Sequence, residues 1–489
     1  MQQRSSSEID QPFAMLIDGQ WVGAAAGQTF TCVDPYTDES WGRIPEASPS
    51  EVDRAVRAAR RAFDAGGWRQ TLPAQRAALL RKLARLIEAN AEALTYQQIR
   101  ENGKLVSEMR PQLDVLASAC YYFAGLAETL TGASLTSGFA GLTTYTVREP
   151  IGVVAAVTPW NSPLLLLGWK LFPALAAGNT VVVKPSEVTP ASTLRLAALV
   201  EEAGFPAGVV NVVTGHGPVG GALIEHHGVD RIAFTGSTAT GRVIARAAAE
   251  RHARVTLELG GKSPNIIFAD ANVSRAVDGI IAGVFAASGQ TCVAGSRVLV
   301  ESAVYEEVAE LLVSRARKLA PGDPLDPGTR LGPLASRAQL TKVLAYFDIA
   351  REERLELLTG GRRLDRRGFF VEPTVYGRVD NHCRVAREEI FGPVACLMRF
   401  SGEDEAVALA NDTVYGLAAG VWTESLRRAH RVVPRLRAGT VWVNNYRLIS
   451  HAVPFGGFKQ SGLGRELGPE ALHEYTEPKS VWIDATAGS

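Results

Sequence analysis

Short apolar runs alternate with helical stretches through the middle of the chain, and this alternation limits the possible folds most strongly. Four β-rich runs come first, at 151–157, 180–185, 208–214 and 231–236, and a plausible helical stretch follows each of the first three. Five more runs follow, at 264–270, 296–301, 394–400, 418–423 and 438–445. Strands that alternate with helices indicate a parallel sheet covered by helices on both faces. We therefore expect an α/β protein with two consecutive α/β domains.

The two ends of the chain read differently from the middle. Residues 51–65 and 74–104 have helical periodicity, which in the second segment comes from leucines such as Leu79, Leu80 and Leu83. The segment 479–485 has the pattern of a lone strand with no helix after it. Such a terminal strand is often pinned to another sheet, for example that of a neighbouring subunit, which favours an oligomer.

Charge and composition exclude several classes of partner. The chain has 51 basic and 51 acidic residues, so nothing indicates a nucleic-acid or anionic-membrane surface. No apolar run reaches the ~18 residues of a membrane span. The five cysteines are widely spaced without a CxxC pair, so we expect no disulfide framework or metal site, and a reducing compartment such as the cytoplasm. The first 13 residues lack the apolar run of a signal peptide, and Glu8 and Asp10 argue against a transit peptide.

Cys292 is the candidate nucleophile. It lies in "GQTCVAGSR" (289–297), where small residues leave room for a substrate carbon, in an expected turn between a helix near 275–287 and a strand. The pKa of a free thiol is near ~8.5, and a helix N-terminus or nearby dipoles can lower it. Simple packing explains most lone cysteines, so the partners of Cys292 must decide.

Two polar residues at strand ends are the candidate partners. Glu258 ends a strand in "TLELGGKSPN" (256–265), where burial would raise the pKa of the carboxyl toward the working range of a base. The alternative is a glutamate paired with Lys262 or an arginine. Asn161 lies in "TPWNSP" between two prolines that stiffen the loop, where its amide could form an oxyanion hole with a backbone N–H. The alternative is a turn asparagine that bonds its own backbone.

Three segments at strand ends could hold a nucleotide. "GHGPVG" (215–220) matches G-x-G-x-x-G but lacks the acidic residue expected about 20 positions on, so we interpret its glycines as turn residues. "FTGSTATG" (234–241) leads into a helix whose free N–H groups could bind a pyrophosphate, although by itself an ordinary capped helix is the simpler interpretation. "VVVKPSE" (181–187) places Lys184 and Glu187 where ligands bind in open α/β sheets, and a solvated charged turn is the alternative there.

Taken together, these motifs resemble the NAD(P)-dependent aldehyde dehydrogenase superfamily over nearly the whole chain. Eight segments occur in the order of that family: "IDGQWV" (17–22), "TPWNSP", "KPSE", "FTGST", "LELGGKSP", "GQTC", "EEIFGPV" (388–394) and "PFGGFKQSGLGRELG" (454–468). Eight ordered matches are far more specific than any one of them.

The resemblance implies a reaction and a role for each catalytic residue. Cys292 attacks an aldehyde to give a thiohemiacetal, while Asn161 and the Cys292 backbone N–H hold the oxyanion. Hydride then passes to the nicotinamide, and Glu258 activates the water that releases a carboxylic acid from the thioester. Lys170 is also assigned to catalysis. NAD is the expected cofactor, because Glu187 would repel the 2′-phosphate of NADP, which remains the alternative.

The resemblance also assigns contacts to the cofactor and to the substrate tunnel. In this family the helix after "FTGST" carries the phosphates. The cofactor set is Trp160, Lys184, Ser186, Glu187, Gly220, Phe234, Gly236, Ser237, Glu389 and Phe391. The tunnel set is Ser162, Trp169, Thr291, Val293, Arg447 and Phe455.

Two tunnel residues depart from the usual pattern. Ser162 stands where many members carry phenylalanine, which leaves the shape of the tunnel open. Arg447 would favour an aldehyde that carries an anion, such as a semialdehyde, if its side chain points inward, and a solvated arginine is the simpler alternative.

The family fold implies a division of the chain and an assembly. We expect an NAD-binding domain from 1–130 and 150–260, a catalytic domain from 261–465, and an oligomerisation arm from 131–149 and 466–489. Members of the family are usually dimers or tetramers.

Three rival functions stay open at this point. A CoA-acylating relative would use a thiol in place of water, and Glu258 argues against it. A catalytically silent member would serve as a structural or binding protein, against which the intact Cys292, Glu258 and Asn161 count. A plain esterase would use the same thiol without NAD.

Overall fold

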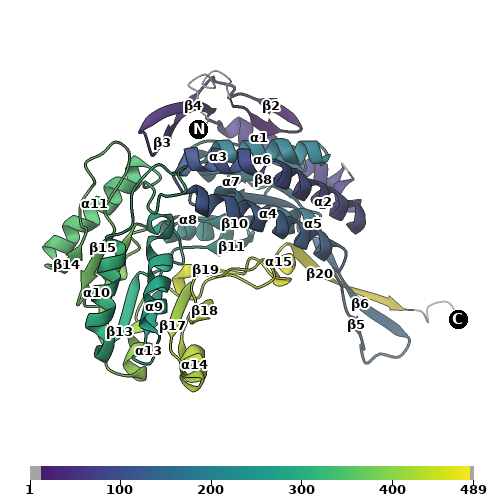
Figure 1. Cartoon of the computed structure of the whole chain (residues 1–489). Helices are drawn as coiled ribbons and strands as arrows, with labels where there is room; N and C mark the ends of the chain where they lie inside the picture. The colour runs from purple at the N-terminus through teal and green to yellow at the C-terminus, as the bar shows by residue number, and fades with distance from the viewer. Residues whose placement is uncertain (1–12, 66, 485–489) are drawn as a thin grey trace.

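The computed structural model describes residues 13–65 and 67–484, which form two large sheets and a projecting β arm (Figure 1). The first sheet has eight strands in the spatial order β19 (Gly462–Leu463), β11 (Arg254–Glu258), β10 (Arg231–Thr235), β7 (Val153–Val157), β8 (Thr180–Lys184), β9 (Val210–Val212), β1 (Met15–Ile17) and β2 (Gln20–Val22). Its five central strands, β11 to β9, are parallel, and antiparallel strands complete both edges.

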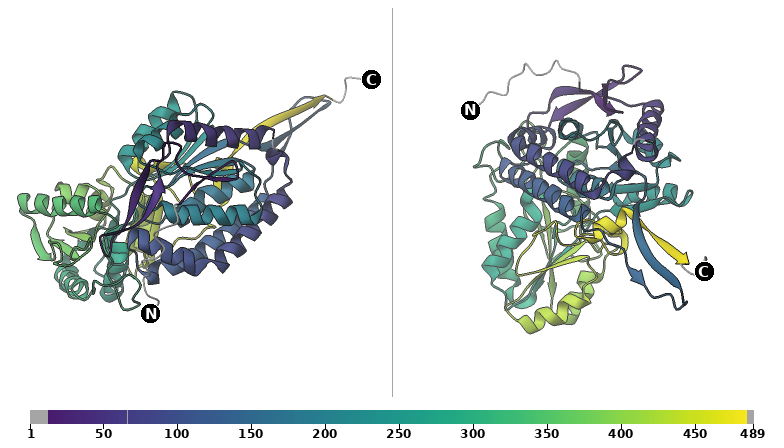
Figure 2. Two further views of the ribbon diagram at one scale, coloured as in Figure 1. Left: turned by 90° about the horizontal axis from the view of Figure 1, so that it is seen from above. Right: turned by 90° about the vertical axis from the view of Figure 1, so that its right-hand side faces the viewer.

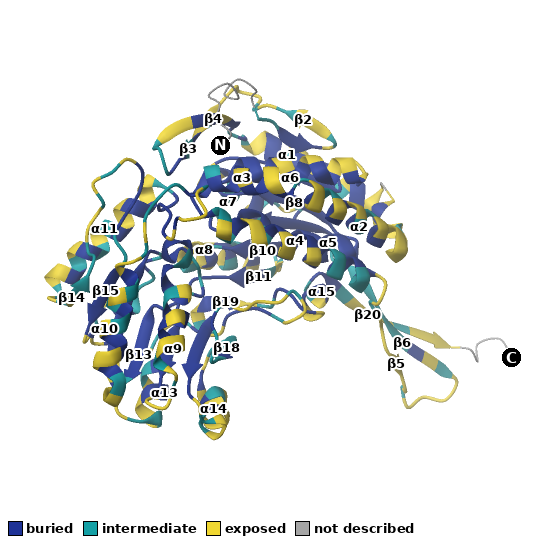
Figure 3. Cartoon of the chain, in the orientation of Figure 1, coloured by how far each residue is buried: buried dark blue, intermediate teal, exposed yellow. Residues whose placement is uncertain are grey.

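The central strands of this sheet are apolar throughout because helices cover both faces. Along β7, Val154 and Ala156 pack on one face and Val153 and Ala155 on the other. The first face carries α2 (Pro73–Ala89), α3 (Ala91–Asn102), α4 (Val106–Ala127), α5 (Pro163–Ala177) and α6 (Pro190–Ala203). The second carries α1 (Pro49–Asp64), α7 (Gly217–Glu225) and α8 (Thr238–Ala249). Figure 3 shows these strands as buried and the outer helix faces as exposed.

The second sheet has seven strands and the same layered design. Their order is β14 (Glu356–Thr359), β15 (Thr374–Gly377), β16 (Val394–Phe400), β13 (Arg297–Glu301), β12 (Pro264–Ile267), β17 (Ala418–Trp422) and β18 (Thr440–Val443). All pairs except β14–β15 are parallel. One face packs on α9 (Val273–Ile280) and α10 (Tyr305–Ala316). The other packs on α11 (Arg337–Glu352), α12 (Arg384–Arg387), α13 (Glu403–Asn411) and α14 (Leu426–Val432).

A long antiparallel ribbon forms the arm. β20 (Thr476–Asp484) pairs along its whole length with β6 (Leu142–Pro150), which also pairs with β5 (Ser134–Leu135). Figure 2 shows this ribbon leaving the body of the molecule in both views. A smaller ribbon joins β3 (Thr29–Asp34) to β4 (Glu39–Pro45), and the short helix α15 (Glu470–Glu474) precedes β20.

Most expected elements are present, and two expectations need correction. The helix expected over 74–104 is two helices, because Asn90 ends α2 with its side-chain amide bonded to the Leu86 carbonyl at 2.9 Å. The terminal strand is pinned to a sheet, but that sheet belongs to its own chain, and residue 485 lies outside the described residues. The N-terminal residues 1–12, on which the absence of a leader was judged, also lie outside them. Within the described part of the chain, no helix has the length and apolarity to cross a bilayer.

Candidate active site

A cavity of about 170 Å³ lies where strand ends of both sheets meet. It is bounded by the loop after β7, the loop after β10, the segment between β11 and β12, and the turn before β13. The carboxyl ends of parallel strands are the usual place for ligands in open α/β sheets. The residues that line it include Trp160, Asn161, Gly236, Ser237, Cys292, Gln339, Lys342, Glu389 and Phe391.

The turn that presents Cys292 is strained and closely packed. The expected helix near 275–287 ends as an α-helix at Ile280 and continues as a π-helical turn, η3 (Ile281–Phe285), and a short 3-10 turn, η4 (Ala286–Gly289). Ala287 and Ser288 both adopt left-handed backbone angles, which cost about 1–2 kcal/mol each for residues with a side chain. Gly289 is also left-handed, and a Cβ there would lie 2.0 Å from the Gly392 carbonyl oxygen.

Long-range hydrogen bonds hold this turn in place. The Ala287 N–H donates to a Glu108 carboxylate oxygen, and the Ser288 hydroxyl donates to the Gly332 carbonyl at 2.7 Å. The turn is therefore held by α4 and by the segment between α10 and α11, and it places Cys292 at the cavity.

The environment of Cys292 raises the pKa of its thiol to about 12, chiefly through burial and then through the charges of Glu258 and Glu389. Backbone N–H groups of Cys292 and Val293 act in the opposite direction but do not outweigh burial. Local dipoles therefore lower the thiol pKa as the sequence suggested they could, but the effect of burial is larger. Because burial raises the thiol pKa, an attack by this sulfur on a carbonyl would need a base to take its proton.

Glu258 is a buried carboxyl group without a hydrogen-bond partner. It ends β11, is only 3% exposed, and neither carboxyl oxygen meets a donor among the described residues. Burial raises the pKa of Glu258 well above its ordinary value, and the charge of Glu466 raises it further, while Lys170 and Arg465 lower it. A group held in this way can accept a proton near neutral pH.

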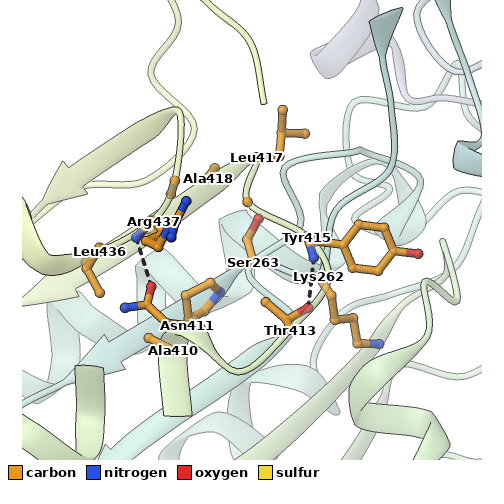
Figure 4. A pocket seen from close by; sticks show the side chains of 14 residues that line it. Lys262, Ser263, Ala410, Asn411, Thr413, Tyr415, Leu417, Ala418, Leu436 and Arg437 are labelled. Carbon is orange, nitrogen blue, oxygen red and sulfur yellow. Dashed lines mark hydrogen bonds between the residues drawn. The ribbon is translucent and has the colours of Figure 1, made fainter. Parts of the chain in front are cut away.

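The alternative partner for Glu258, Lys262, faces a different space. Lys262 lines a separate cavity of about 10 Å³ with Ser263, Asn411 and Tyr415, shown in Figure 4. Burial lowers the pKa of Lys262 to about 8. Among the described residues no ion pair joins Glu258 to Lys262 or to an arginine, so the structural alternative does not explain Glu258.

A buried ion pair lies beside Glu258. The Lys170 ammonium donates to Glu466 at 2.5 Å and to the Thr235 hydroxyl at 2.6 Å, and both charged side chains are at most 1% exposed. Glu466 was missed in the sequence, although it is the only acid in "SGLGRELG" (461–468). One of its carboxylate oxygens also lacks a donor.

Asn161 lines the same cavity as Cys292. It is 6% exposed, and its amide donates to the Gln290 carbonyl at 3.1 Å, two residues before Cys292. Pro163 begins α5 immediately afterwards, so the loop is short and rigid as expected. One N–H of the amide stays available to a ligand in the cavity.

The aldehyde dehydrogenase family model matches residues 21–481. Aldehyde dehydrogenase 1A1 of Mus musculus is 46% identical over 471 residues, which cover 96% of this chain and 94% of the mouse protein. The chain belongs to the aldehyde dehydrogenase family.

Solved structures of the family share the whole fold. An aldehyde dehydrogenase from Bacillus cereus, determined as a complex with NAD+, has a TM-score of 0.96 at 43% identity and covers 98% of both chains. A betaine aldehyde dehydrogenase from Staphylococcus aureus, also in complex with NAD+, has a TM-score of 0.96 at 40% identity and covers 98% of this chain and 95% of its own. The family resemblance and the α/β fold expected from the sequence are therefore confirmed.

In this aldehyde dehydrogenase fold, the expected nicotinamide and pyrophosphate residues gather at the cavity. Trp160 and Phe391 meet edge to face at 5.3 Å between ring centroids. Glu389 accepts from the Gly261 N–H at 3.0 Å, and burial raises the pKa of its carboxyl. Ser237 caps α8 by accepting from the Thr240 N–H, so the first turn of that helix opens onto the same space. Phe234 packs under Gly236 at the end of β10.

The expected ribose residues form a second group after β8. The Lys184 ammonium lies 3.7 Å from the Glu187 carboxylate, and Ser186 lies between them in the chain. The Glu187 side chain is 43% exposed, so it is free to meet a ligand. Gly220 faces this group, because a Cβ there would lie 3.9 Å from the Lys184 side chain.

Four of the expected tunnel residues, Trp169, Phe455, Val293 and Ser162, make contacts inside the fold, whereas Thr291 and Arg447 form a second set. Trp169 and Phe455 pack against each other at 5.2 Å, and the Val293 carbonyl accepts from the Tyr446 hydroxyl at 2.9 Å. Ser162 accepts a hydrogen bond from Lys104, a residue that the sequence did not single out. Thr291 and Arg447 are the second set: Thr291 lines a small space beside Glu389, and Arg447 bonds the Ala282 carbonyl at 2.9 Å.

Proposed function

We propose that this aldehyde dehydrogenase oxidises an aldehyde to the carboxylic acid with NAD, through a covalent bond to Cys292. The observation that carries the proposal is the buried Glu258 carboxyl, which meets no hydrogen-bond donor among the described residues and whose charge acts on the Cys292 thiol. A carboxyl group in that state is costly unless it takes part in proton transfer.

The residues present fit a dinucleotide. The exposed Glu187 carboxylate can accept both hydroxyls of a ribose, the first turn of α8 offers N–H groups to a pyrophosphate, and Trp160, Glu389 and Phe391 surround the space next to Cys292. The two solved relatives in complex with NAD+ support the same choice. The Glu187 carboxylate would repel a 2′-phosphate, so we propose NAD in preference to NADP. NAD, when bound, accepts the hydride.

The reaction then follows from the positions of the protein groups. Glu258 is the base whose charge acts most strongly on Cys292, and it takes the thiol proton as sulfur bonds to the carbonyl carbon. The free Asn161 N–H and the Cys292 backbone N–H hold the oxyanion of the thiohemiacetal. After hydride leaves, Glu258 deprotonates a water molecule that attacks the thioester, and the acid and the free thiol are released.

Lys170 and Glu466 are positioning residues for this base. Their ion pair lies beside Glu258, and its two charges shift the pKa of that carboxyl in opposite directions, in addition to the larger effect of burial. We propose that protons leave Glu258 toward this pair.

The arm, the cysteines and the sheets bear on the assembly, the location and the domain division of the protein. We propose a homo-oligomer, dimer or tetramer, that assembles through the arm, where Leu135, Phe139, Trp482 and Ile483 are exposed apolar side chains. Five free cysteines support a cytoplasmic location. We propose the division into cofactor, catalytic and arm regions on the basis of the three largest sheets among the described residues, although β19 (Gly462–Leu463) joins the first sheet.

A panel of small aldehydes with NAD, followed by NADH formation, tests the proposal. Cys292→Ala should abolish oxidation while NAD binding survives, and Cys383→Ala, which removes a partly exposed thiol elsewhere, should stay active. Normal turnover by Cys292→Ala would refute the covalent route. Turnover that requires CoA would favour the acylating alternative, and silence of the wild type across the panel would favour a binding role.

A further inference from the structure

Lys104 is a buried cation that reaches the active-site loop. It lies between α3 and α4, is 4% exposed, and its ammonium donates to the Ser162 hydroxyl at 2.9 Å. Asn102 fastens the same loop, because its side-chain amide donates to the Trp160 carbonyl at 3.2 Å. The ammonium therefore lies one residue along the chain from the Asn161 amide, beside the small side chain of Ser162.

The charge of Lys104 is not neutralised by an ion pair. Among the described residues, no carboxylate lies within 4.0 Å of its nitrogen, and only one of its three N–H donors meets an acceptor. Glu108 is the acidic group that acts most strongly on it, but the Glu108 oxygens already accept from the backbone N–H groups of Ala287 and Leu105. A buried ammonium with two unused donors is costly unless a ligand meets it.

Arg447 supplies a second cation to the same region. Its guanidinium donates to a neutral acceptor, the Ala282 carbonyl, at 2.9 Å, and its backbone is held at a left-handed φ of +69°. The positive charge of Arg447 lowers the pKa of Lys104, while the charge of Cys292 raises it, so the three groups lie within electrostatic range of one another. Two cations that repel each other, one of them hydrogen-bonded to Ser162 beside Asn161, would both be stabilised by a bound anion.

We propose that Lys104 and Arg447 bind the anionic end of the substrate, so that the enzyme acts on short aldehydes that carry a carboxylate. This inference rests on the proposed function and names its substrate class. The carboxylate would satisfy the unused Lys104 donors and relieve the repulsion between the two cations, while the aldehyde carbon meets Cys292. Ser162, at a position where many family members carry phenylalanine, leaves room for that contact.

The test compares kcat/KM for 4-oxobutanoate and for butanal, which have the same carbon chain and differ in charge. The wild type should prefer 4-oxobutanoate, and Lys104→Met should lower that preference by about tenfold or more, the size expected for one charged hydrogen bond. Arg447→Gln should lower it as well, and the surface variant Lys318→Met should leave it unchanged. Succinate should compete with butanal in the wild type and less well in Arg447→Gln.

The same preference should depend on pH. Burial and Arg447 lower the pKa of Lys104 to about 8, against the raising effects of Glu108 and Cys292. The protonated ammonium binds the carboxylate, so the preference should fall as pH rises through about 8 in the wild type and should stay flat over that range in Lys104→Met.

Three results would overturn the inference. One is a wild type that oxidises butanal without preferring 4-oxobutanoate. Another is a Lys104→Met enzyme that loses both substrates in equal proportion, which would assign Lys104 a structural role. The third is an Arg447→Gln enzyme with the same preference for 4-oxobutanoate over butanal as the wild type. This third result is the test that remains if Lys104→Met does not fold. A wild type inactive on every aldehyde would contradict the proposed function instead.

Discussion

Replacing Glu258 with glutamine removes the base from both halves of the proposed reaction. Glutamine has the same shape but cannot take a proton, and the fold loses no hydrogen bond, because both Glu258 oxygens lack donors. Loss of a positioned general base typically costs roughly 10²–10⁴ in rate, which corresponds to about 2.7–5.4 kcal/mol of activation free energy. We expect kcat of Glu258→Gln to fall by that factor.

Rapid mixing with aldehyde and NAD gives the decisive assay. Because Glu258 takes the thiol proton as well as activating water, Glu258→Gln should show no rapid burst of NADH before its slow steady state. The kcat of the wild type should rise with pH as Glu258 ionises, at a pH above the ordinary range of a glutamate, because burial raises its pKa. That rise should be absent in Glu258→Gln. A variant with normal kcat, or one with the same pH profile as the wild type, would refute the reasoning.

The pH dependence of the free energy of unfolding offers an independent test, because the raised pKa of Glu258 fixes its sign. The folded state raises the pKa of Glu258 above its ordinary value of 4.5, so the folded protein holds this proton more tightly than the unfolded chain. The wild type therefore loses stability from this group as pH rises from about 4.5 through the folded pKa. Glu258→Gln should lack that loss and should be more resistant to urea than the wild type at alkaline pH. Parallel dependence of the two urea midpoints on pH would contradict the burial argument.

Two further changes test the oxyanion hole and the choice of cofactor. Asn161→Ala should lower kcat by roughly 10²–10³ because one oxyanion donor is lost, with the NAD dissociation constant little changed; a loss below tenfold in steady-state assays would remove Asn161 from that role. Glu187→Gln should reduce the ratio of kcat/KM for NAD to that for NADP, since the carboxylate no longer repels the 2′-phosphate, and an unchanged ratio would show that Glu187 does not select the cofactor.

Much of the fold could be predicted from the sequence because its central strands are buried on both faces. Runs such as 151–157 and 394–400 are almost wholly apolar, and the structure places β7 and β16 within them. The break at Asn90 could not be predicted, because the apolar pattern continues across it and only a side-chain hydrogen bond changes the direction of the chain. β14 and β15 were missed because neither run stands out from its loop surroundings.

The candidate site was predictable where a residue ends a strand, and not where distant segments decide its environment. Cys292, Glu258 and Asn161 all flank strands, and the structure brings Cys292 and Asn161 to one cavity, with Glu258 acting on the thiol. Glu466 meets Lys170 across 296 positions of the chain, and Lys104 meets Ser162 across 58. The direction of the thiol pKa also depends on burial, which local sequence does not report.

The pairing of β11 with β19 has a consequence for how the enzyme is made. Glu258 lies opposite Gly462 at the edge of the first sheet, about 200 residues later in the chain. Domains usually fold as they leave the ribosome, N-terminal parts first. In this chain the first sheet cannot gain its edge strand β19 until residues 462–463 have been synthesised. A chain that is stalled on the ribosome before residue 462 therefore leaves the proposed catalytic base, Glu258, without its neighbouring strand.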